Sequence, residues 1–189
     1  MLYMGNAAYW EQKFAQRGPD PLPPDPQLLR DLSLLPQPGE GLELACGDGR
    51  NLLLLARLGW QMTGVDWSRQ GLSRLEAFAR QESRPVRTLE ADLTDPAFLS
   101  RLGRYRLILI NHYRPDPSLY AGLLPHLEPG GCLWVNGFRA CPPENPDIRP
   151  QDLLTPADFA ALKTLPCRFQ AYEEGRKPLA RWIFTQIFG

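Results

Sequence analysis

Residues 42–51 read Leu-Glu-Leu-Ala-Cys-Gly-Asp-Gly-Arg-Asn, a short apolar run that breaks at the small and polar residues 46–49. A leucine-rich stretch over 52–58 follows and ends at Gly59. Small residues between a strand and a helix let the backbone turn sharply and approach a ligand at the helix N-terminus. The stretch therefore predicts a strand, a ligand-binding loop and a helix, in that order.

The same alternation continues along the chain. Apolar runs predict further strands, and capped amphipathic stretches between them predict helices, which together indicate crossover connections and a parallel sheet. The last two runs are separated by only about five residues, too few for a crossover, so this pair is expected to be antiparallel. The sequence predicts an α/β fold: a Rossmann-like, doubly wound, mostly parallel sheet closed by a C-terminal antiparallel hairpin, with helices on both faces. The predicted strands are 41–45, 60–65, 86–91, 106–110, 132–135, 167–173 and 179–188, and the predicted helices after the first loop start near 68, 96, 117 and 156, the last two spanning 117–127 and 156–165.

Length, charge and composition narrow the class of protein. The 189 residues predict one domain over 1–189, with an N-terminal arm and proline-rich linker at 1–25 and an α/β core at 26–189. Lys+Arg and Asp+Glu both number 21, so the basic excess typical of nucleic-acid or membrane-surface binding is missing. The chain has no apolar run of membrane-spanning length and no signal-peptide pattern at its start, which predicts a cytoplasmic protein. Four scattered cysteines and two histidines predict neither a disulfide scaffold nor a metal site.

The proline-rich linker at 18–26 ends in a helix start. Asp25 can cap that helix, and Pro26 fits its first turn because the missing N–H would have no partner there. The same order of cap and proline recurs at 116–117 and 155–156, which predicts two more helix starts.

Acidic residues follow the first three predicted strands. Asp66 comes 17 residues after Gly49 and can accept hydrogen bonds from both ribose hydroxyls, while Asp92 can accept one from a purine amine. Leu52 stands where the dinucleotide-binding pattern needs a small residue. Carboxylates at Glu43 and Asp48 flank the loop; they would repel a pyrophosphate and attract a sulfonium or ammonium group. S-adenosylmethionine fits these charges and NAD fits them poorly, so an NAD-dependent oxidoreductase is the less favoured alternative.

Four segments together carry a family resemblance: residues 42–51, Gly-Val-Asp-Trp-Ser at 64–68, Glu-Ala-Asp-Leu at 90–93 and Leu-Glu-Pro-Gly-Gly-Cys-Leu at 127–133. They resemble class I S-adenosylmethionine-dependent methyltransferases. Tyr-Trp-Glu-Gln-Lys-Phe at 9–14, followed by the proline-rich stretch, is similar to the small tellurite-resistance and thiopurine methyltransferase branch. The resemblance covers about residues 9–189. It implies S-adenosyl-L-methionine as cofactor, bound by Trp10, Glu43, Ala45, Cys46, Gly47, Gly49, Asn51, Asp66, Trp67, Asp92, Leu93 and Asn111.

Several of these residues also have a purely structural interpretation. Trp10 could cover the cofactor through a cation–π contact or simply anchor the arm, and Trp67 could pack on the adenine or on neighbouring helices. Cys46 could be a small buried filler. Ala45 stands where a glycine is usual, and we expect it to fit the turn with a negative φ.

Two residues after the fourth strand are candidate catalytic groups. His112 is the only histidine expected near the acceptor, where neutral imidazole suits a general base, although a plain loop histidine is the alternative. Tyr113 could assist oxygen or nitrogen acceptors.

The predicted function is methyl transfer by in-line displacement to a small-molecule nucleophile, which could be a thiol or chalcogen, an amine, a hydroxyl or a carboxyl group. The segments at 9–10, 111–116 and 139–151 are expected to wall the acceptor pocket. A non-catalytic S-adenosylmethionine-binding module is the main alternative. No nucleic-acid or membrane partner is expected, and the protein is expected to be a monomer or homodimer.

Overall fold

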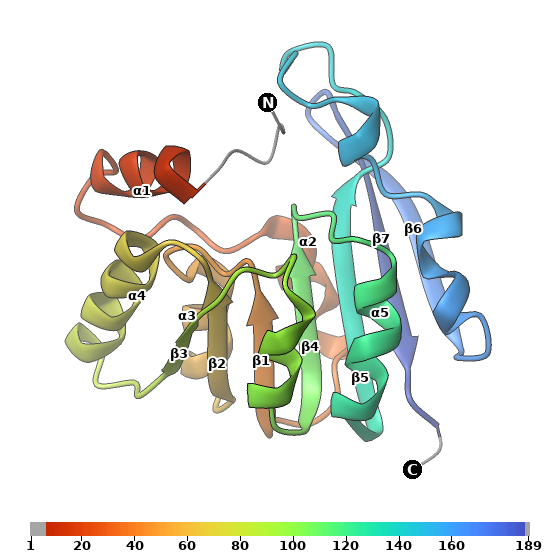
Figure 1. Ribbon diagram of the computed structural model, residues 1–189, viewed down its shortest axis with the longest axis horizontal. Coiled ribbons are helices and arrows are strands. Elements are labelled where there is room, and N and C mark those ends of the chain that lie inside the picture. The colour runs from red at the N-terminus through yellow and green to blue at the C-terminus, as the bar shows by residue number, and fades with distance from the viewer. Residues whose placement is uncertain (1–6, 188–189) are drawn as a thin grey trace.

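The computed structural model describes residues 7–187 and shows one seven-stranded sheet in the order β3-β2-β1-β4-β5-β7-β6, with helices on both faces (Figure 1). The strands are β1 Glu40–Leu44, β2 Gln61–Asp66, β3 Arg87–Glu90, β4 Tyr105–Asn111, β5 Leu127–Phe138, β6 Cys167–Glu174 and β7 Lys177–Thr185. The α-helices are α1 Ala7–Ala15, α2 Pro26–Asp31, α3 Arg50–Arg57, α4 Arg69–Gln81 and α5 Ser118–Leu123. Short 3-10 helices lie at Leu32–Leu34, Pro96–Arg101, Leu124–His126, Pro150–Asp152 and Pro156–Leu162.

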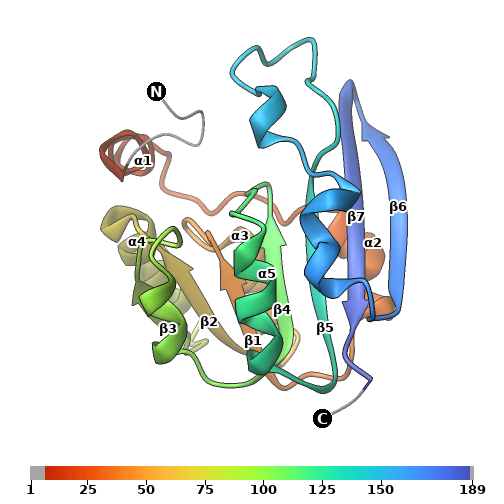
Figure 2. The same cartoon turned by 45° about the vertical axis from the view of Figure 1, so that its right-hand side comes forward.

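The predicted fold class is confirmed. Strands β1 to β5 pair in parallel, and β7 pairs antiparallel with both β5 and β6. The hairpin of β6 and β7 closes one side of the sheet (Figure 2). Because β1, β2, β3, β4 and β5 all point the same way, their carboxyl ends meet at one edge, which is the upper edge in Figure 1.

The core lies on both faces of the sheet, as the nearly continuous apolar strands predict. In β4, Leu107 and Leu109 pack with α2, α3 and α4, whereas Ile108 and Ile110 pack on the opposite face with α5 and the 3-10 helix at Pro156–Leu162. All four of these side chains are fully buried. Burial on two sides makes β4 a rigid central support for the residues at its end.

The predicted helix caps are confirmed at two helices. Asp25 accepts a hydrogen bond from the Gln27 backbone N–H at 2.9 Å at the start of α2, and Ser68 accepts one from the Gly71 N–H at 3.0 Å at the start of α4.

Several element boundaries differ from the prediction. The arm contains a helix, α1, which lies before the proline-rich stretch and was not predicted. The helix expected over 117–127 ends as α5 at Leu123 and continues as a 3-10 turn containing Pro125, and the one expected over 156–165 is a 3-10 helix throughout. Strand β5 starts at Leu127 and not at 132 as predicted. The glycines at 130 and 131, which suggested a turn, lie within the strand, and its pairing with β4 shifts register there. The predicted end of the last strand, at 188, and the chain start in which no signal peptide was expected lie outside the described residues.

Within residues 7–187 no helix has both the length and the apolar content that crossing a membrane requires.

Candidate cofactor and acceptor site

The loop after β1 has three residues with positive φ: Ala45 at 52°, Gly47 at 55° and Gly49 at 82°. The expectation of a negative φ at Ala45 is therefore wrong. A non-glycine residue in this region costs about 1–2 kcal/mol, and such strain concentrates at functional sites. Gly49 is the N-cap of α3, so the loop ends at the first turn of a helix.

Asp66 ties the end of β2 to this loop. One of its carboxylate oxygens accepts a hydrogen bond from the Gly47 N–H at 2.8 Å, and the other accepts one from the Ser68 N–H at 2.9 Å. The carboxylate is buried, and burial raises its pKa above the usual value. Because each carboxylate oxygen can accept more than one hydrogen bond, Asp66 keeps acceptor capacity for ribose hydroxyls.

Glu43 lies on β1 beneath the loop and is fully enclosed. Its Oε1 accepts a hydrogen bond from the Asn51 side chain at 3.1 Å, whereas its Oε2 has no hydrogen-bond partner among the described residues. Burial raises the pKa of this carboxyl to about 8. A cationic group bound nearby would favour the ionised form of this carboxyl and give its free oxygen a partner, so this part of the site fits a sulfonium- and ammonium-bearing cofactor.

The flanking charge at Asp48 does not have the predicted role. Asp48 is paired with Arg17 at 2.6 Å and with Arg74 at 3.4 Å, so its charge is already balanced. Cys46 points its side chain into the core beside Gly64, and burial raises the pKa of its thiol well above the usual value. Cys46 is therefore an inert filler whose contribution to a site would come from its backbone.

The residues after β2 and β3 lie at the same edge. Asp92 is exposed and accepts two hydrogen bonds from Thr94, one from its N–H at 2.9 Å and one from its hydroxyl at 2.8 Å. Leu93 packs partly against the core, and Trp67 is half-buried. The Asp92 side chain is thus held in a turn, with its second oxygen free of these two bonds.

Tyr113 follows β4, on the same side as the strand-end acids. Burial and the negative charges of Asp92 and Asp66 raise its pKa to about 12. The phenol therefore keeps its proton at neutral pH, and its assistance to oxygen or nitrogen acceptors stays a prediction.

Helix α1 lies over this edge of the sheet, against α4 (Figures 1 and 2). The buried residue of this helix is Phe14, whose ring lies against Gly47 and Gly71. Trp10 packs on Phe14 with ring centroids 5.7 Å apart, and the Lys13 ammonium lies 4.5 Å from the Trp10 ring. The cation over Trp10 in this structure is therefore a lysine of the same helix.

Asn111 and His112, at the end of β4, converge on Asp25. The Asn111 amide donates to the Asp25 carboxylate at 3.2 Å, and His112 Nε2 lies 3.1 Å from the same oxygen. His112 has a φ of 52°, which makes it the second strained residue at a strand end after Ala45. The Asn51 side chain accepts a hydrogen bond from the Asp25 N–H at 2.8 Å.

The sequence did not indicate the contacts of four residues here. Asp25 was predicted as a helix cap only, and Phe14, Asn136 and Tyr172 were not singled out. A polar residue inside an apolar strand was an available indication for Asn136, which is fully buried on β5. The pairing of Asp25 with His112 joins residues 87 apart in the chain, and no local pattern reports such a contact.

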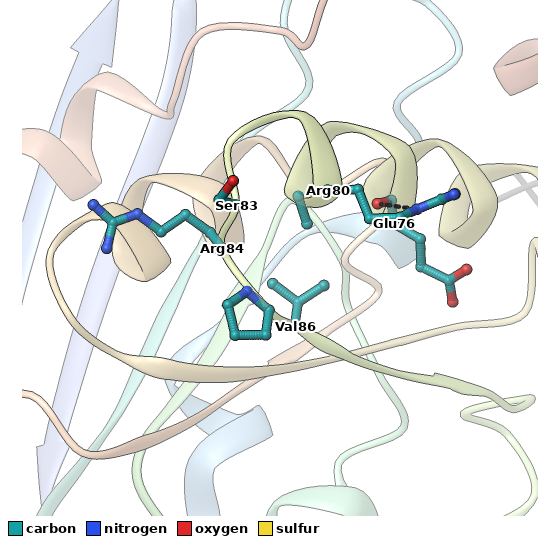
Figure 3. A pocket seen from close by; sticks show the side chains of 7 residues that line it. Glu76, Arg80, Ser83, Arg84 and Val86 are labelled. Atoms are coloured by element: carbon teal, nitrogen blue, oxygen red, sulfur yellow. Dashed lines mark hydrogen bonds between the residues drawn. The ribbon is translucent and has the colours of Figure 1, made fainter.

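A cavity also lies away from the strand ends described above. It has a volume of about 460 Å³ and is lined by the end of α4 and the loop that leads to β3, where Arg80 and Arg84 flank Ser83 (Figure 3). It lies at the opposite, amino-terminal end of β3. No group of three or more His, Cys, Asp or Glu side chains that could hold a metal ion occurs in the described part of the chain.

Comparison with known proteins agrees with this geometry. Residues 42–131 match the family model described as a methyltransferase domain. The ribosomal RNA small subunit methyltransferase C of Alcanivorax borkumensis is 30% identical over 117 residues, which are 57% of this chain and 35% of that protein. The chain spans about a third of the length of the curated relatives that it matches.

Solved structures share the fold at low sequence identity. TehB from Haemophilus influenzae has a TM-score of 0.69 at 16% identity, covering 95% of this chain and 66% of that one. Magnesium protoporphyrin IX methyltransferase (ChlM) from Synechocystis, solved with bound S-adenosylmethionine, has a TM-score of 0.62 at 14% identity, covering 95% and 79%. Residues 42–131, just under half of the chain, thus match a methyltransferase domain, and the chain shares the fold of these solved methyltransferases.

Proposed function

We propose that the chain transfers a methyl group from S-adenosylmethionine to a small-molecule nucleophile by in-line displacement. The observation that carries this proposal is the arrangement at the carboxyl ends of β1 and β2. There Asp66 fixes the loop through the Gly47 N–H, and Glu43 presents an unpartnered carboxyl oxygen beneath it. An adenosine-bearing cation matches both features.

The proposed roles follow from position. Asp66 would hold the ribose, and Asp92 with Leu93 and Trp67 would lie at the adenine. The backbone of residues 45–49, with Glu43, Asn51 and Asn111, would hold the amino-acid end, while Phe14 and Trp10 of α1 would cover it. When bound, the cofactor supplies an activated methyl group, so the protein has mainly to align donor and acceptor. Such alignment is worth about 7–11 kcal/mol in well-oriented systems.

Calorimetric titration with S-adenosylmethionine and S-adenosylhomocysteine tests the cofactor site. Asp66→Ala should weaken binding by about 1–3 kcal/mol, because the ribose hydroxyls would lose their acceptor. Asp66→Asn keeps an acceptor for the Gly47 N–H. Comparing it with Asp66→Ala therefore distinguishes loss of the ribose contact from loss of the hydrogen bond that fixes the loop. Glu128→Ala removes a carboxylate that pairs with Arg106, and it should leave affinity unchanged.

The same titrations discriminate the alternatives. Tight binding of NAD and none of S-adenosylhomocysteine would contradict the proposal in favour of an oxidoreductase. Cofactor binding without transfer to any thiol, amine, hydroxyl or carboxyl acceptor in single-turnover assays would indicate a non-catalytic binding module.

A further inference from the structure

Asp25 contacts four polar groups from three parts of the molecule: the first turn of α2, the start of α3 and the end of β4. Its Oδ1 accepts the Gln27 N–H at 2.9 Å, which is the helix-cap bond of α2. Its Oδ2 lies 2.8 Å from the Arg50 guanidinium, 3.2 Å from the Asn111 amide nitrogen and 3.1 Å from His112 Nε2. Asp25 is 2% exposed, and these partners lower its pKa to about 2 in spite of that burial. It is therefore an ionised, acceptor-only group at neutral pH.

The orientation of Asn111 is fixed by a chain of donors. The Tyr172 hydroxyl donates to the side-chain Oδ1 of Asn136 at 2.7 Å, and the Asn136 side-chain amide donates to Oδ1 of Asn111 at 3.0 Å. The Asn111 amide must then face Asp25 as a donor. In this series of three hydrogen bonds, each donor lies farther from Asp25 than its acceptor. The network therefore runs from β6 through β5 and β4 and ends on the Asp25 carboxylate.

The tautomer of His112 follows from this arrangement. Because the ionised Asp25 can only accept, His112 Nε2 must carry the proton. In the neutral ring, Nδ1 then presents a lone pair. Nδ1 is enclosed and has no hydrogen-bond partner among the described residues, and a buried polar atom of this kind calls for a ligand.

We propose that Asp25 is a positioning residue that holds His112 as the Nε2–H tautomer, so that Nδ1 takes the proton of the methyl acceptor. This inference rests on the proposed function and names the acceptor class: a hydroxyl or protonated amine, which must lose a proton to be methylated. A thiol that is already ionised would not use the pair.

The proton and electron balance is simple. The acceptor O–H gives its proton to Nδ1, its oxygen lone pair forms the new bond to the methyl carbon, and the electron pair of the breaking carbon–sulfur bond stays on sulfur. The resulting imidazolium faces the Asp25 carboxylate, which also faces Arg50. The other side of the ring packs on Phe138, with centroids 5.4 Å apart. The pair is thus the orienting carboxylate and base of a general-base site.

The tautomer is measurable without activity. The chain has two histidines, His112 and His126, so His126→Gln assigns the imidazole signals in two-bond proton–nitrogen correlation spectra. The wild type should show His112 protonated at Nε2 only. Asp25→Asn keeps the helix-cap acceptor for Gln27 but removes the charge, and it should give a mixture of tautomers or the Nδ1–H form. A wild-type Nδ1–H tautomer, or spectra unchanged in Asp25→Asn, would overturn the proposal.

A matched pair of acceptors tests the catalytic consequence. At pH 7.5 phenol keeps its proton, whereas thiophenol is ionised. Asp25→Asn and His112→Gln should each lower kcat for phenol by about 10- to 100-fold, and the double variant should lose no more than the single ones. With thiophenol the loss should stay within about threefold.

The outcomes separate this inference from the proposed function. Three results would overturn the role of the pair and leave methyl transfer intact. They are equal losses of kcat for both acceptors, additive losses in the double variant, and methylation of thiophenol alone by the wild type. Failure to methylate either compound with S-adenosylmethionine bound would overturn the acceptor class. Absence of S-adenosylmethionine binding, with the Nε2–H tautomer still present, would instead contradict the proposed function.

Discussion

At the scale of single residues, the site depends on backbone positions that few side chains tolerate. Gly49 has a φ of 82°, and a Cβ there would lie 2.3 Å from Cδ1 of Leu75, which is fully buried. Gly130 has a φ of 74° but open space around its Cβ position. The two glycines share a backbone conformation and differ in what surrounds them. Substituting each by alanine therefore distinguishes the free-energy cost of steric overlap from that of the positive φ.

Gly49→Ala should lower the free energy of unfolding by about 2–4 kcal/mol, because overpacking against Leu75 adds to the cost of the positive φ. Gly130→Ala should lower it by about 1 kcal/mol, from the backbone cost alone. Urea unfolding of both variants measures the difference. Equal losses would mean that Leu75 moves aside without cost.

Glu43 makes stability depend on pH in a predictable direction. Below about pH 4.5 its carboxyl is protonated in the folded and the unfolded chain, so its contribution is fully present. As the pH rises toward 8, the unfolded chain releases a proton that the folded protein keeps, and stability falls by up to about 1.4 kcal/mol per pH unit. In Glu43→Gln this decline between pH 5 and 8 should be smaller, as measured by urea unfolding at several pH values. An unchanged slope would show that Glu43 ionises normally in the folded state.

At the scale of elements, α2 is held to the sheet by an enclosed ion pair. The Arg181 guanidinium on β7 lies 2.8 Å from the Asp31 carboxylate at the end of α2, and Trp134 of β5 donates its indole N–H to the same carboxylate at 2.9 Å. Both charged side chains are almost completely buried. The contact also places Asp25, at the other end of α2, beside His112.

Arg181→Met should therefore lower the free energy of unfolding by about 3–5 kcal/mol, because it leaves the Asp31 charge buried without its partner. Arg106→Met removes an ion pair to Glu128 that is largely exposed, and it should cost less than about 1 kcal/mol. Adding Asp31→Asn to Arg181→Met should recover part of the loss. If Asp31→Asn does not reduce the loss of stability, the loss comes from packing and not from the buried charge.

The same elements show what the sequence could and could not predict. The alternation of strands and helices, the antiparallel hairpin and the caps at Asp25 and Ser68 depend on local patterns, and these predictions are confirmed. The partners of Asp31 and Asp25 lie 150 and 87 residues away, and only the folded chain brings them together. The prediction of a negative φ at Ala45 was wrong for a related reason. The loop that Asp66 anchors determines this φ, and the preference of alanine itself does not.

At the scale of the whole molecule, the equal numbers of basic and acidic residues bear on the class of acceptor. A relative over 57% of this chain is named as a ribosomal RNA methyltransferase, whereas the acceptor proposed here is a small molecule. Many arginines are already matched to carboxylates, as with Arg17 and Arg74 on Asp48. The excess of positive charge that would release counterions from a phosphate backbone is missing, because the net charge is zero.

Binding of a fluorescein-labelled RNA hairpin, followed by anisotropy, should therefore be weaker than about 10⁻⁴ M at 150 mM salt. The titration is repeated with S-adenosylhomocysteine present, because an ordered cofactor loop could complete an RNA surface. A Kd below about 1 µM that weakens steeply with salt would contradict a small-molecule acceptor. It would leave the cofactor site unaffected, since Asp66 and Glu43 are buried beneath the loop and would contact the methyl donor in either case.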